Sequence, residues 1–144
     1  MSVIAFSVRA RADLGGANEL VPIIDGHELT DMIHAFERDH RMEERAVSYG
    51  GLIPSFFKFG PLRRHFLGQW EFAEPRRKVP LLGCNCGEWG CWPLMARITV
   101  QGGAVVWNEF EQPYRKERDY SGFGPFTFDV AQYQKALATV RDLG

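Results

Sequence analysis

Three cysteines clustered in one short segment are the residues of this chain best suited to chemistry. Cys84, Cys86 and Cys91 lie in the run GCNCGEWGCWP, residues 83–93, in the pattern C-x-C-x4-C with glycines between them. Thiolate sulfurs are good ligands for zinc and for iron–sulfur clusters, and glycines let a backbone fold tightly around one point. A metal-binding turn that uses these three sulfurs is therefore one interpretation of the segment.

The same cysteines allow two other interpretations. A structural zinc site normally takes four ligands, and no local spacing selects a fourth from the histidines, which are His27, His34, His40 and His65. Paired cysteines can instead act as redox-active thiols, because one of them can trap an oxidised partner. They can also be small buried residues in a tight connection, as free cysteines commonly are.

A second candidate region follows a predicted strand, where loops often carry function. If this loop folds over the cysteine turn, the two would form an aromatic-walled surface in which Arg115 can bind a carboxylate or phosphate. The residues expected on this surface are Trp89, Trp92, Trp107, Gln112, Tyr114 and Arg115. The alternative is a loop that Trp107 and Tyr114 pin to the core.

The elements that must position these residues include two predicted hairpins. Residues 3–12 alternate between apolar and polar side chains, and a Gly-Gly break separates them from a second apolar run, which predicts an N-terminal hairpin over 3–24. Pro22 implies that its strand is an edge or is irregular. Alternating runs on both sides of Gly102 and Gly103 predict a central hairpin over 94–110. Residues 79–82 are expected to form a brief strand that leads into the cysteine turn.

Two predicted helices complete the fold. Asp25 and Glu28 match a capping box, and an apolar stripe follows. Together they predict a helix near 26–47 that ends before the pair Gly50 and Gly51. Asp129 and Gln132 match a second capping box and predict a C-terminal helix near 130–143. A short helical face is expected after Pro61. Antiparallel strand pairs with separate helices favour an α+β fold.

Length and composition restrict the class of protein. A chain of 144 residues predicts a single domain over 1–144, and a net charge of −1 argues against nucleic acid as a partner. The chain has no long apolar run and no secretory signal, so we expect a cytoplasmic protein without a membrane segment. Exposed edge strands could pair in a homodimer.

The sequence leaves open whether the protein is an enzyme, because no standard catalytic motif is present. Our first hypothesis is a non-enzymatic binding module for a protein or small molecule, with no cofactor. Its surface would combine the turn 84–91 with the loop 107–115. The alternative is a metal-binding protein, with zinc or an iron–sulfur cluster, or a thiol-redox protein that uses Cys84, Cys86 and Cys91.

The stretch LLGCNCGEWGCWPLMARITVQGGAVVWNEFEQPYR, residues 81–115, resembles the signature of a family of uncharacterised bacterial proteins. In that signature a cysteine-rich GCxCGxxGCWP turn is followed by a hairpin and a WxxFxQPxR segment. The C-terminal run FTFDVAQYQKAL also fits it. The resemblance implies a bacterial origin, and it implies no activity and no functional residues.

Overall fold

The part of the chain that the structure describes forms two antiparallel sheets and three α-helices, which confirms the predicted α+β class. The computed structural model describes residues 1–42, 49–56, 61–69, 78–86 and 93–140. One sheet has the order β1-β2-β3, with β1 Ile4–Arg11, β2 Ala17–Ile24 and β3 His27–Glu28. The other has the order β4-β5-β6-β7-β8, with β4 Tyr49–Gly50, β5 Val79–Cys84, β6 Leu94–Gln101, β7 Ala104–Glu111 and β8 Phe126–Asp129. The helices are α1 Leu29–Asp39, α2 Leu62–His65 and α3 Val130–Ala138.

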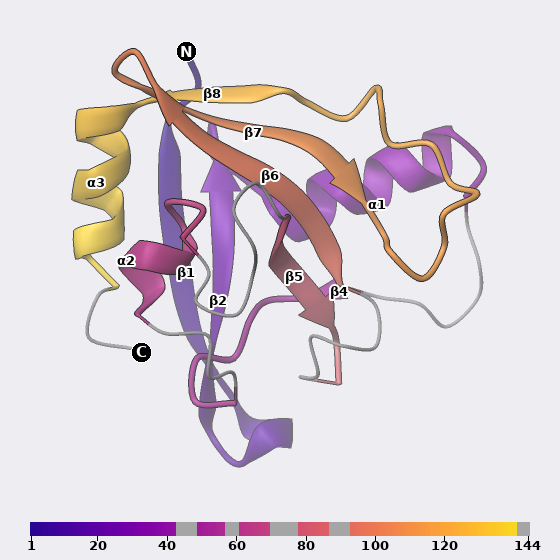
Figure 1. Cartoon of the computed structure of the whole chain (residues 1–144). Helices are drawn as coiled ribbons and strands as arrows, with labels where there is room; N and C mark the ends of the chain where they lie inside the picture. Colours follow the sequence, from indigo (N-terminus) through magenta and orange to yellow (C-terminus); the bar gives the residue numbers. More distant parts are fainter. Residues whose placement is uncertain (43–48, 57–60, 70–77, 87–92, 141–144) are drawn as a thin grey trace.

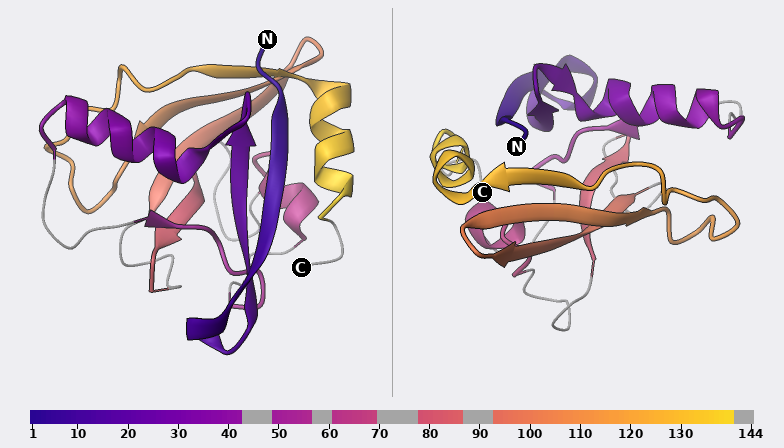
Figure 2. Two further views of the ribbon diagram at one scale, coloured as in Figure 1. Left: turned by 180° about the vertical axis from the view of Figure 1, so that it is seen from behind. Right: turned by 90° about the horizontal axis from the view of Figure 1, so that it is seen from above.

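The sheets form two layers that enclose the hydrophobic core. In the view from above, β6, β7 and β8 lie in one layer, and β1 and β2 lie in the other together with α1 (Figure 2). Helices α2 and α3 lie together at one end of the molecule (Figure 1). Two isolated bridges connect the layers, because Ser2 pairs with Phe128 of β8 and Leu20 of β2 pairs with Leu52.

Both predicted hairpins are confirmed. Strands β1 and β2 pair along their whole length, from Ile4 opposite Ile24 to Arg11 opposite Ala17. Strands β6 and β7 meet at a two-residue turn in which Gly102 and Gly103 have φ angles of 60° and 77°. Such a turn needs left-handed conformations at both central positions, which glycine adopts without strain.

Pro22 occupies a position in β2 where no neighbouring strand needs its amide. Leu20 exchanges two backbone hydrogen bonds with Leu52, and Ile24 pairs with His27 of β3, so these residues direct their backbone groups away from β1. Pro22 is two residues from Leu20 and two from Ile24, so its backbone nitrogen also points away from β1. Its missing N–H therefore removes no hydrogen bond from the ladder, which agrees with the edge predicted from the proline, whereas the β1–β2 register is regular at Pro22.

The start of α1 differs from the capping box predicted at Asp25 and Glu28. Asp25 has a φ angle of 51°, and its carboxylate accepts a hydrogen bond of 2.8 Å from the amide of Val3. That hydrogen bond holds the pKa of Asp25 below its ordinary value. Glu28 precedes the first helical residue without a side-chain cap, and its carboxylate pairs with Arg9. The prediction is wrong because both carboxylates bind partners in the N-terminal segment instead.

The helix also ends earlier than the predicted limit of residue 47. α1 has 11 residues, and the chain leaves it at Arg41, which has a φ angle of 56°. The amide of Arg41 donates to the carbonyl of Arg38 at 3.1 Å, and the amide of Met42 donates to that of Glu37 at 2.7 Å, which is a Schellman motif. Glycine usually occupies this left-handed position. Because an arginine occupies it here, the sequence pattern did not predict that the helix ends at this point. Residues 43–48 lie outside the described part of the chain.

The predicted cap of the C-terminal helix is confirmed at Asp129. Its carboxylate accepts a hydrogen bond of 3.0 Å from the amide of Gln132. The Gln132 side chain does not close the capping box, because its amide binds both the N–H and the C=O of Ile4 on the edge of β1. α3 ends at Ala138, short of the predicted limit of 143, and residues 141–144 lie outside the described residues.

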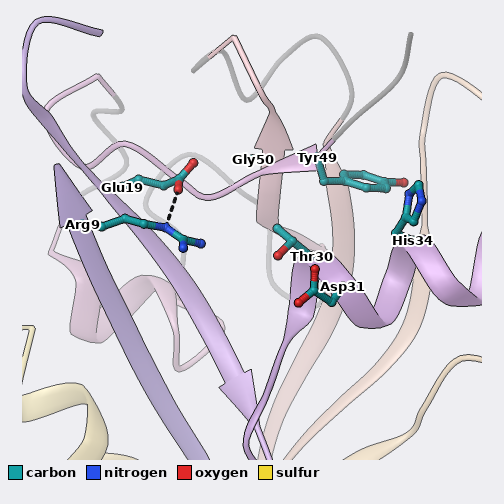
Figure 3. Close-up of a pocket in the computed structure, with 7 residues that line it drawn as sticks. All are labelled: Arg9, Glu19, Thr30, Asp31, His34, Tyr49 and Gly50. Carbon is teal, nitrogen blue, oxygen red and sulfur yellow. Dashed lines mark hydrogen bonds and ion pairs between the residues drawn. The ribbon is translucent and has the colours of Figure 1, made fainter. Parts of the chain in front are cut away.

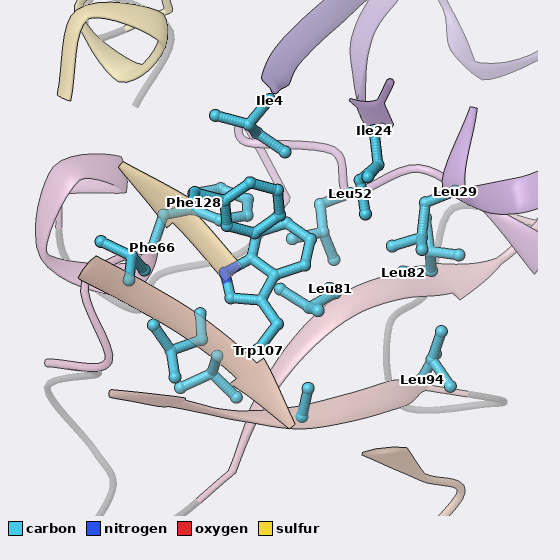
Figure 4. Packing of buried hydrophobic residues seen from close by; sticks show 14 of the residues in the cluster. Ile4, Ile24, Leu29, Leu52, Phe66, Leu81, Leu82, Leu94, Trp107 and Phe128 are labelled. Atoms are coloured by element: carbon cyan, nitrogen blue, oxygen red, sulfur yellow. The ribbon is translucent and has the colours of Figure 1, made fainter. Parts of the chain in front are cut away.

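Trp107 lies at the centre of the core, where it has no solvent exposure. Its ring lies between the two layers with Phe128, Phe66 and Ile4 around it (Figure 4). The indole N–H donates to the hydroxyl of Tyr133 at 3.0 Å, and that hydroxyl donates to the carbonyl of Phe66 at 2.5 Å. Burial raises the pKa of Tyr133, so the hydroxyl stays protonated and both polar groups are satisfied.

The short face predicted after Pro61 is confirmed as α2, a single turn whose Leu62 and His65 are buried. A ring nitrogen of His65, Nε2, lies 2.7 Å from the carbonyl of Pro80 and therefore donates to it. Burial disfavours the charged imidazolium and lowers the pKa of His65 to about 4, against 6.5 for an ordinary histidine. His65 therefore carries no charge in the folded protein near neutral pH.

Acidification should destabilise the fold through His65. Between pH 6.5 and 4 the unfolded chain binds a proton at this residue and the folded chain does not, so the stabilisation present above pH 6.5 is lost as the pH falls toward 4. We expect a loss of about 3 kcal/mol in the wild type relative to His65→Gln, measured by urea unfolding across this range. The exposed His27→Gln is the control and should follow the wild type. Parallel pH profiles for wild type and His65→Gln would contradict the expectation.

Candidate functional site

The cysteine turn is described only in part. Cys84 is the last residue of β5 and is buried, with 8% exposure, whereas Cys86 is exposed. The amide of Cys86 lies 3.5 Å from the Cys84 sulfur, toward which it donates. Cys91, Trp89 and Trp92 lie outside the described residues. Within the described part, no three His, Cys, Asp or Glu side chains are grouped as metal ligands would be. Metal binding and thiol chemistry at this turn stay predictions, because Cys91 lies outside the described residues.

Three of the four residues expected on the surface of the loop 107–115 are buried. Trp107 is a core residue, and Gln112 and Arg115 are only 2% and 7% exposed. Tyr114 is the exception, with 67% exposure. Trp107 therefore contributes to packing and not to a partner surface, because its indole is needed at the centre of the core. The interpretation that Trp107 pins the loop describes this segment better, although Tyr114 itself points outward.

Gln112 does bring the loop and the cysteine turn together, but inside the protein. Its side-chain amide donates to the hydroxyl of Tyr49, and Tyr49 pairs across the sheet with Cys84. The Tyr49 hydroxyl in turn donates to the carboxylate of Glu37 at 2.7 Å. The two regions singled out in the sequence therefore meet at Tyr49, as part of a largely buried hydrogen-bond network.

Glu37 is the acceptor at the centre of this network. The hydroxyl of Tyr120 donates to the same carboxylate oxygen at 2.6 Å, and the guanidinium of Arg118 lies at 3.2 Å from it. Burial, with the neighbouring Glu37 charge, raises the pKa of Tyr49, and burial also raises that of Tyr120. Both hydroxyls therefore remain protonated donors. The network ties the last turn of α1 to β4 and to the segment 112–120.

A pocket of about 250 Å³ opens between the β1–β2 hairpin, the first turns of α1, and β4. Nearly all of its lining side chains are polar or charged. The lining residues are Arg9, Glu19, Thr30, Asp31, His34, Tyr49 and Gly50. Figure 3 shows Arg9 and Glu19 on one side of the pocket and Tyr49 with His34 on the other. Thr30 and Asp31 lie between these pairs (Figure 3).

Glu19 anchors the hairpin side of the pocket. It is 5% exposed and lies directly opposite Arg9 in the β1–β2 ladder. Its two carboxylate oxygens accept from Arg9 Nε at 3.1 Å, from Arg11 Nη1 at 2.8 Å and from the amide of Gly51 at 3.0 Å. Arg11 also donates to the carbonyl of Asn85 at 2.6 Å, which connects the network to the cysteine turn. A buried carboxylate is tolerated here because charge-assisted hydrogen bonds surround it.

Glycine is required where the chain passes over Glu19. A Cβ atom on Gly51 would lie 2.4 Å from the carbonyl oxygen of Leu20 and 2.6 Å from Cγ of Glu19. A Cβ atom on Gly50 would lie 2.9 Å from the Cα atom of Asn85. This Gly-Gly pair was interpreted from the sequence as a helix end and turn, but its role is the close approach of β4 to β2 and to the cysteine turn.

The open groups of the pocket are on α1. Asp31 is exposed in the first turn of the helix, and His34 is exposed one turn later. Within the described residues, neither side chain has a hydrogen-bond or ion-pair partner, whereas Arg9 pairs with Glu19 and Glu28, and Glu19 also pairs with Arg11. The pocket therefore presents a carboxylate, an imidazole and the Thr30 hydroxyl to a ligand.

Sequence reasoning missed this pocket because its residues come from four separate segments. The hairpin register carried one usable signal, since it places Arg9 opposite Glu19 on one face of β1 and β2. The helical spacing carried another, since Asp31 and His34 lie three residues apart on α1. Neither signal indicates that β4 completes the pocket.

No family model, curated protein or solved structure matches the chain. The resemblance to an uncharacterised bacterial family therefore remains an expectation from the sequence. The longest helix in the described part of the chain, α1, has 11 residues, and none there is long and apolar enough to cross a membrane.

Loss of the Glu19 charge should destabilise the protein. Glu19→Gln leaves Arg9 and Arg11 without their shared carboxylate, and we expect the free energy of unfolding to fall by about 1–3 kcal/mol. The control is Glu28→Gln, which removes a partner of Arg9 that is 33% exposed and should cost less than about 1 kcal/mol. Denaturant unfolding of both variants measures the difference. Equal losses would show that Glu19 is not the anchor.

Steric contact should make Gly51 intolerant of substitution. The Cβ atom of Gly51→Ala would overlap backbone and side-chain atoms of β2, so we expect a loss of about 3 kcal/mol or more in unfolding free energy. Gly122→Ala is a matched control, because its Cβ atom would meet only Phe36 at an ordinary 3.5 Å. Thermal unfolding of the two variants tests this, and a Gly51→Ala protein as stable as the control would contradict the close approach.

Proposed function

We propose that this protein is a binding protein for a small polar molecule, which occupies the pocket between the β1–β2 hairpin, α1 and β4. The observation that carries the proposal is the contrast between the pocket's two sets of polar groups. Glu19 accepts a buried hydrogen bond and Tyr49 donates a partly buried one, whereas Asp31 and His34 are left without partners among the described residues. Groups that are held rigidly next to groups that are free suit recognition, because little order is lost on binding.

The dimensions and chemistry of the pocket restrict the ligand. A volume of about 250 Å³ is below the roughly 300 Å³ at which pockets for drug-sized ligands begin, so the ligand is smaller than such molecules. A carboxylate, an imidazole and a hydroxyl favour a ligand with its own hydrogen-bonding groups. This proposal keeps the binding function expected from the sequence and moves it away from the surface of Trp107 and Arg115, whose side chains are buried.

The proposal also keeps the remaining expectations from the sequence. These are that the protein is bacterial and cytoplasmic, that it does not act on nucleic acid, and that it can pair into a homodimer through an exposed strand edge. A partner surface that includes Tyr114 and Cys86 is also still proposed, because both residues are exposed. Neither residue lines the pocket, so this surface and the pocket can be tested separately.

Ligand binding can be tested by NMR with a set of small amines, polyols and carboxylic acids. We expect at least one compound to shift the amide signals of Thr30, Asp31 and Gly50 with a saturable dependence and a Kd of about 1 mM or tighter. The variant Thr30→Phe fills the pocket and should abolish these shifts. Thr99→Phe, on the exposed part of β6, adds the same ring elsewhere and should not.

Two outcomes would contradict this function. In the first, no compound produces saturable shifts at the pocket at concentrations of about 10 mM. In the second, the same shifts persist unchanged in Thr30→Phe, which would place the binding site elsewhere on the protein.

A further inference from the structure

The charges around the pocket do not balance, and this imbalance points to the chemical class of its ligand. The following inference rests on the proposed binding function. Two arginines, Arg9 and Arg11, are surrounded by carboxylates with which they form ion pairs. Those carboxylates are Glu19, Glu28 and Asp13. Asp31 adds a further negative charge in the pocket itself, so the region carries an excess of negative charge.

Neither arginine neutralises Asp31. Arg9 uses Nε for Glu19 and Nη2 for Glu28, and Arg11 uses its guanidinium nitrogens for Glu19, Asp13 and the carbonyl of Asn85. No described residue forms an ion pair or hydrogen bond with the Asp31 side chain. Asp31 lies in the first turn of α1, where the positive end of the helix dipole favours a charged carboxylate. The pocket therefore holds a carboxylate that no described cationic side chain pairs with.

Tyr49 supplies the second feature that selects for a cation. Its hydroxyl is directed into the protein, where it donates to Glu37 and accepts from Gln112. Because the hydroxyl is engaged in this way, the aromatic ring is the part of Tyr49 that remains available to a ligand in the pocket. The face of such a ring attracts cations, and aromatic rings are used to recognise ammonium ligands.

We propose that the pocket binds the ammonium group of a small organic amine, with the Asp31 carboxylate as its counter-ion and the Tyr49 ring as its aromatic wall. Thr30 can accept a hydrogen bond from the same ammonium group. His34 is the other titratable group on α1 that faces the pocket, and a protonated imidazole there would repel a cation. Arg9 faces the pocket from β1, but two carboxylates compensate its charge.

Three probes of similar size and different charge test this inference. They are n-butylammonium, n-butanol and butyrate, each titrated by NMR at low ionic strength and at pH 8, where histidine side chains are largely neutral. We expect saturable shifts at Thr30, Asp31 and Gly50 with n-butylammonium, and no saturable shifts with butyrate. Added salt should weaken the binding, because the main contact is between charges.

The matched variants are Asp31→Asn and Asp39→Asn, at the two ends of the same helix. Both remove one negative charge, but Asp39 does not line the pocket. Asp31→Asn should weaken n-butylammonium binding by about tenfold or more, whereas Asp39→Asn should change it by less than about twofold. Circular dichroism is the folding control, and we expect both variants to be folded, since each change is at an exposed site.

The possible failures are distinguishable. If n-butanol or butyrate binds the pocket as tightly as n-butylammonium, or if both variants weaken the amine equally, the amine assignment is overturned and the proposed binding function stands. The same conclusion follows if only polyols or acids from the larger set of compounds bind. If no compound of either set produces saturable shifts at the pocket, the binding function and the amine assignment are both wrong.

Discussion

The buried carboxylate of Glu19 is the interaction on which the arrangement around the pocket depends. A charge removed from water is stable only when other charged or polar groups surround it. Here Arg9 and Arg11 approach from β1 and the amide of Gly51 approaches from the chain after β4. The carboxylate therefore joins segments that are distant in the sequence, and each of them is held where its hydrogen bond to Glu19 can form. The absence of a side chain at Gly51 is what allows this approach.

A second buried carboxylate, Glu37, stabilises the opposite side of the pocket. Tyr49 and Tyr120 donate to one of its oxygens, and Arg118 provides the compensating charge. Tyr49 belongs both to this network and to the pocket wall, so the ring position is set by contacts that a ligand does not need to make. Side chains fixed in this way lose little freedom when a ligand binds, which favours affinity in a small site.

The cysteine turn and the pocket are connected through β4. Tyr49 and Gly50 pair with Cys84 and Gly83, and Arg11 reaches from the Glu19 network to the carbonyl of Asn85. The described base of the turn is thus held by the same elements that form the pocket. This connection gives the turn a structural role whatever the chemistry of its sulfurs. It also explains the glycine at position 50, because a bulkier residue there would separate β4 from the turn.

Local patterns in the sequence determined the elements whose stabilising contacts are local. The two hairpins, the cap at Asp129 and the turn of helix after Pro61 follow from alternation, glycine pairs and capping residues. The end of α1 did not, because Arg41 adopts a conformation that glycine usually adopts. Trp107 shows the same limit, because a residue type expected at a binding surface can equally serve as packing.

Only the tertiary structure decided which polar residues meet. The alternation of β1 placed Arg9 and Arg11 on its polar face. Glu19, Asp31 and Tyr49 come close to this face only because separate elements pack together, which no local pattern indicates. Burial of the two carboxylates depends on that packing, since a charged side chain in an isolated strand or helix remains in water. Periodicity describes how one element divides into apolar and polar faces, whereas a pocket depends on how several elements pack.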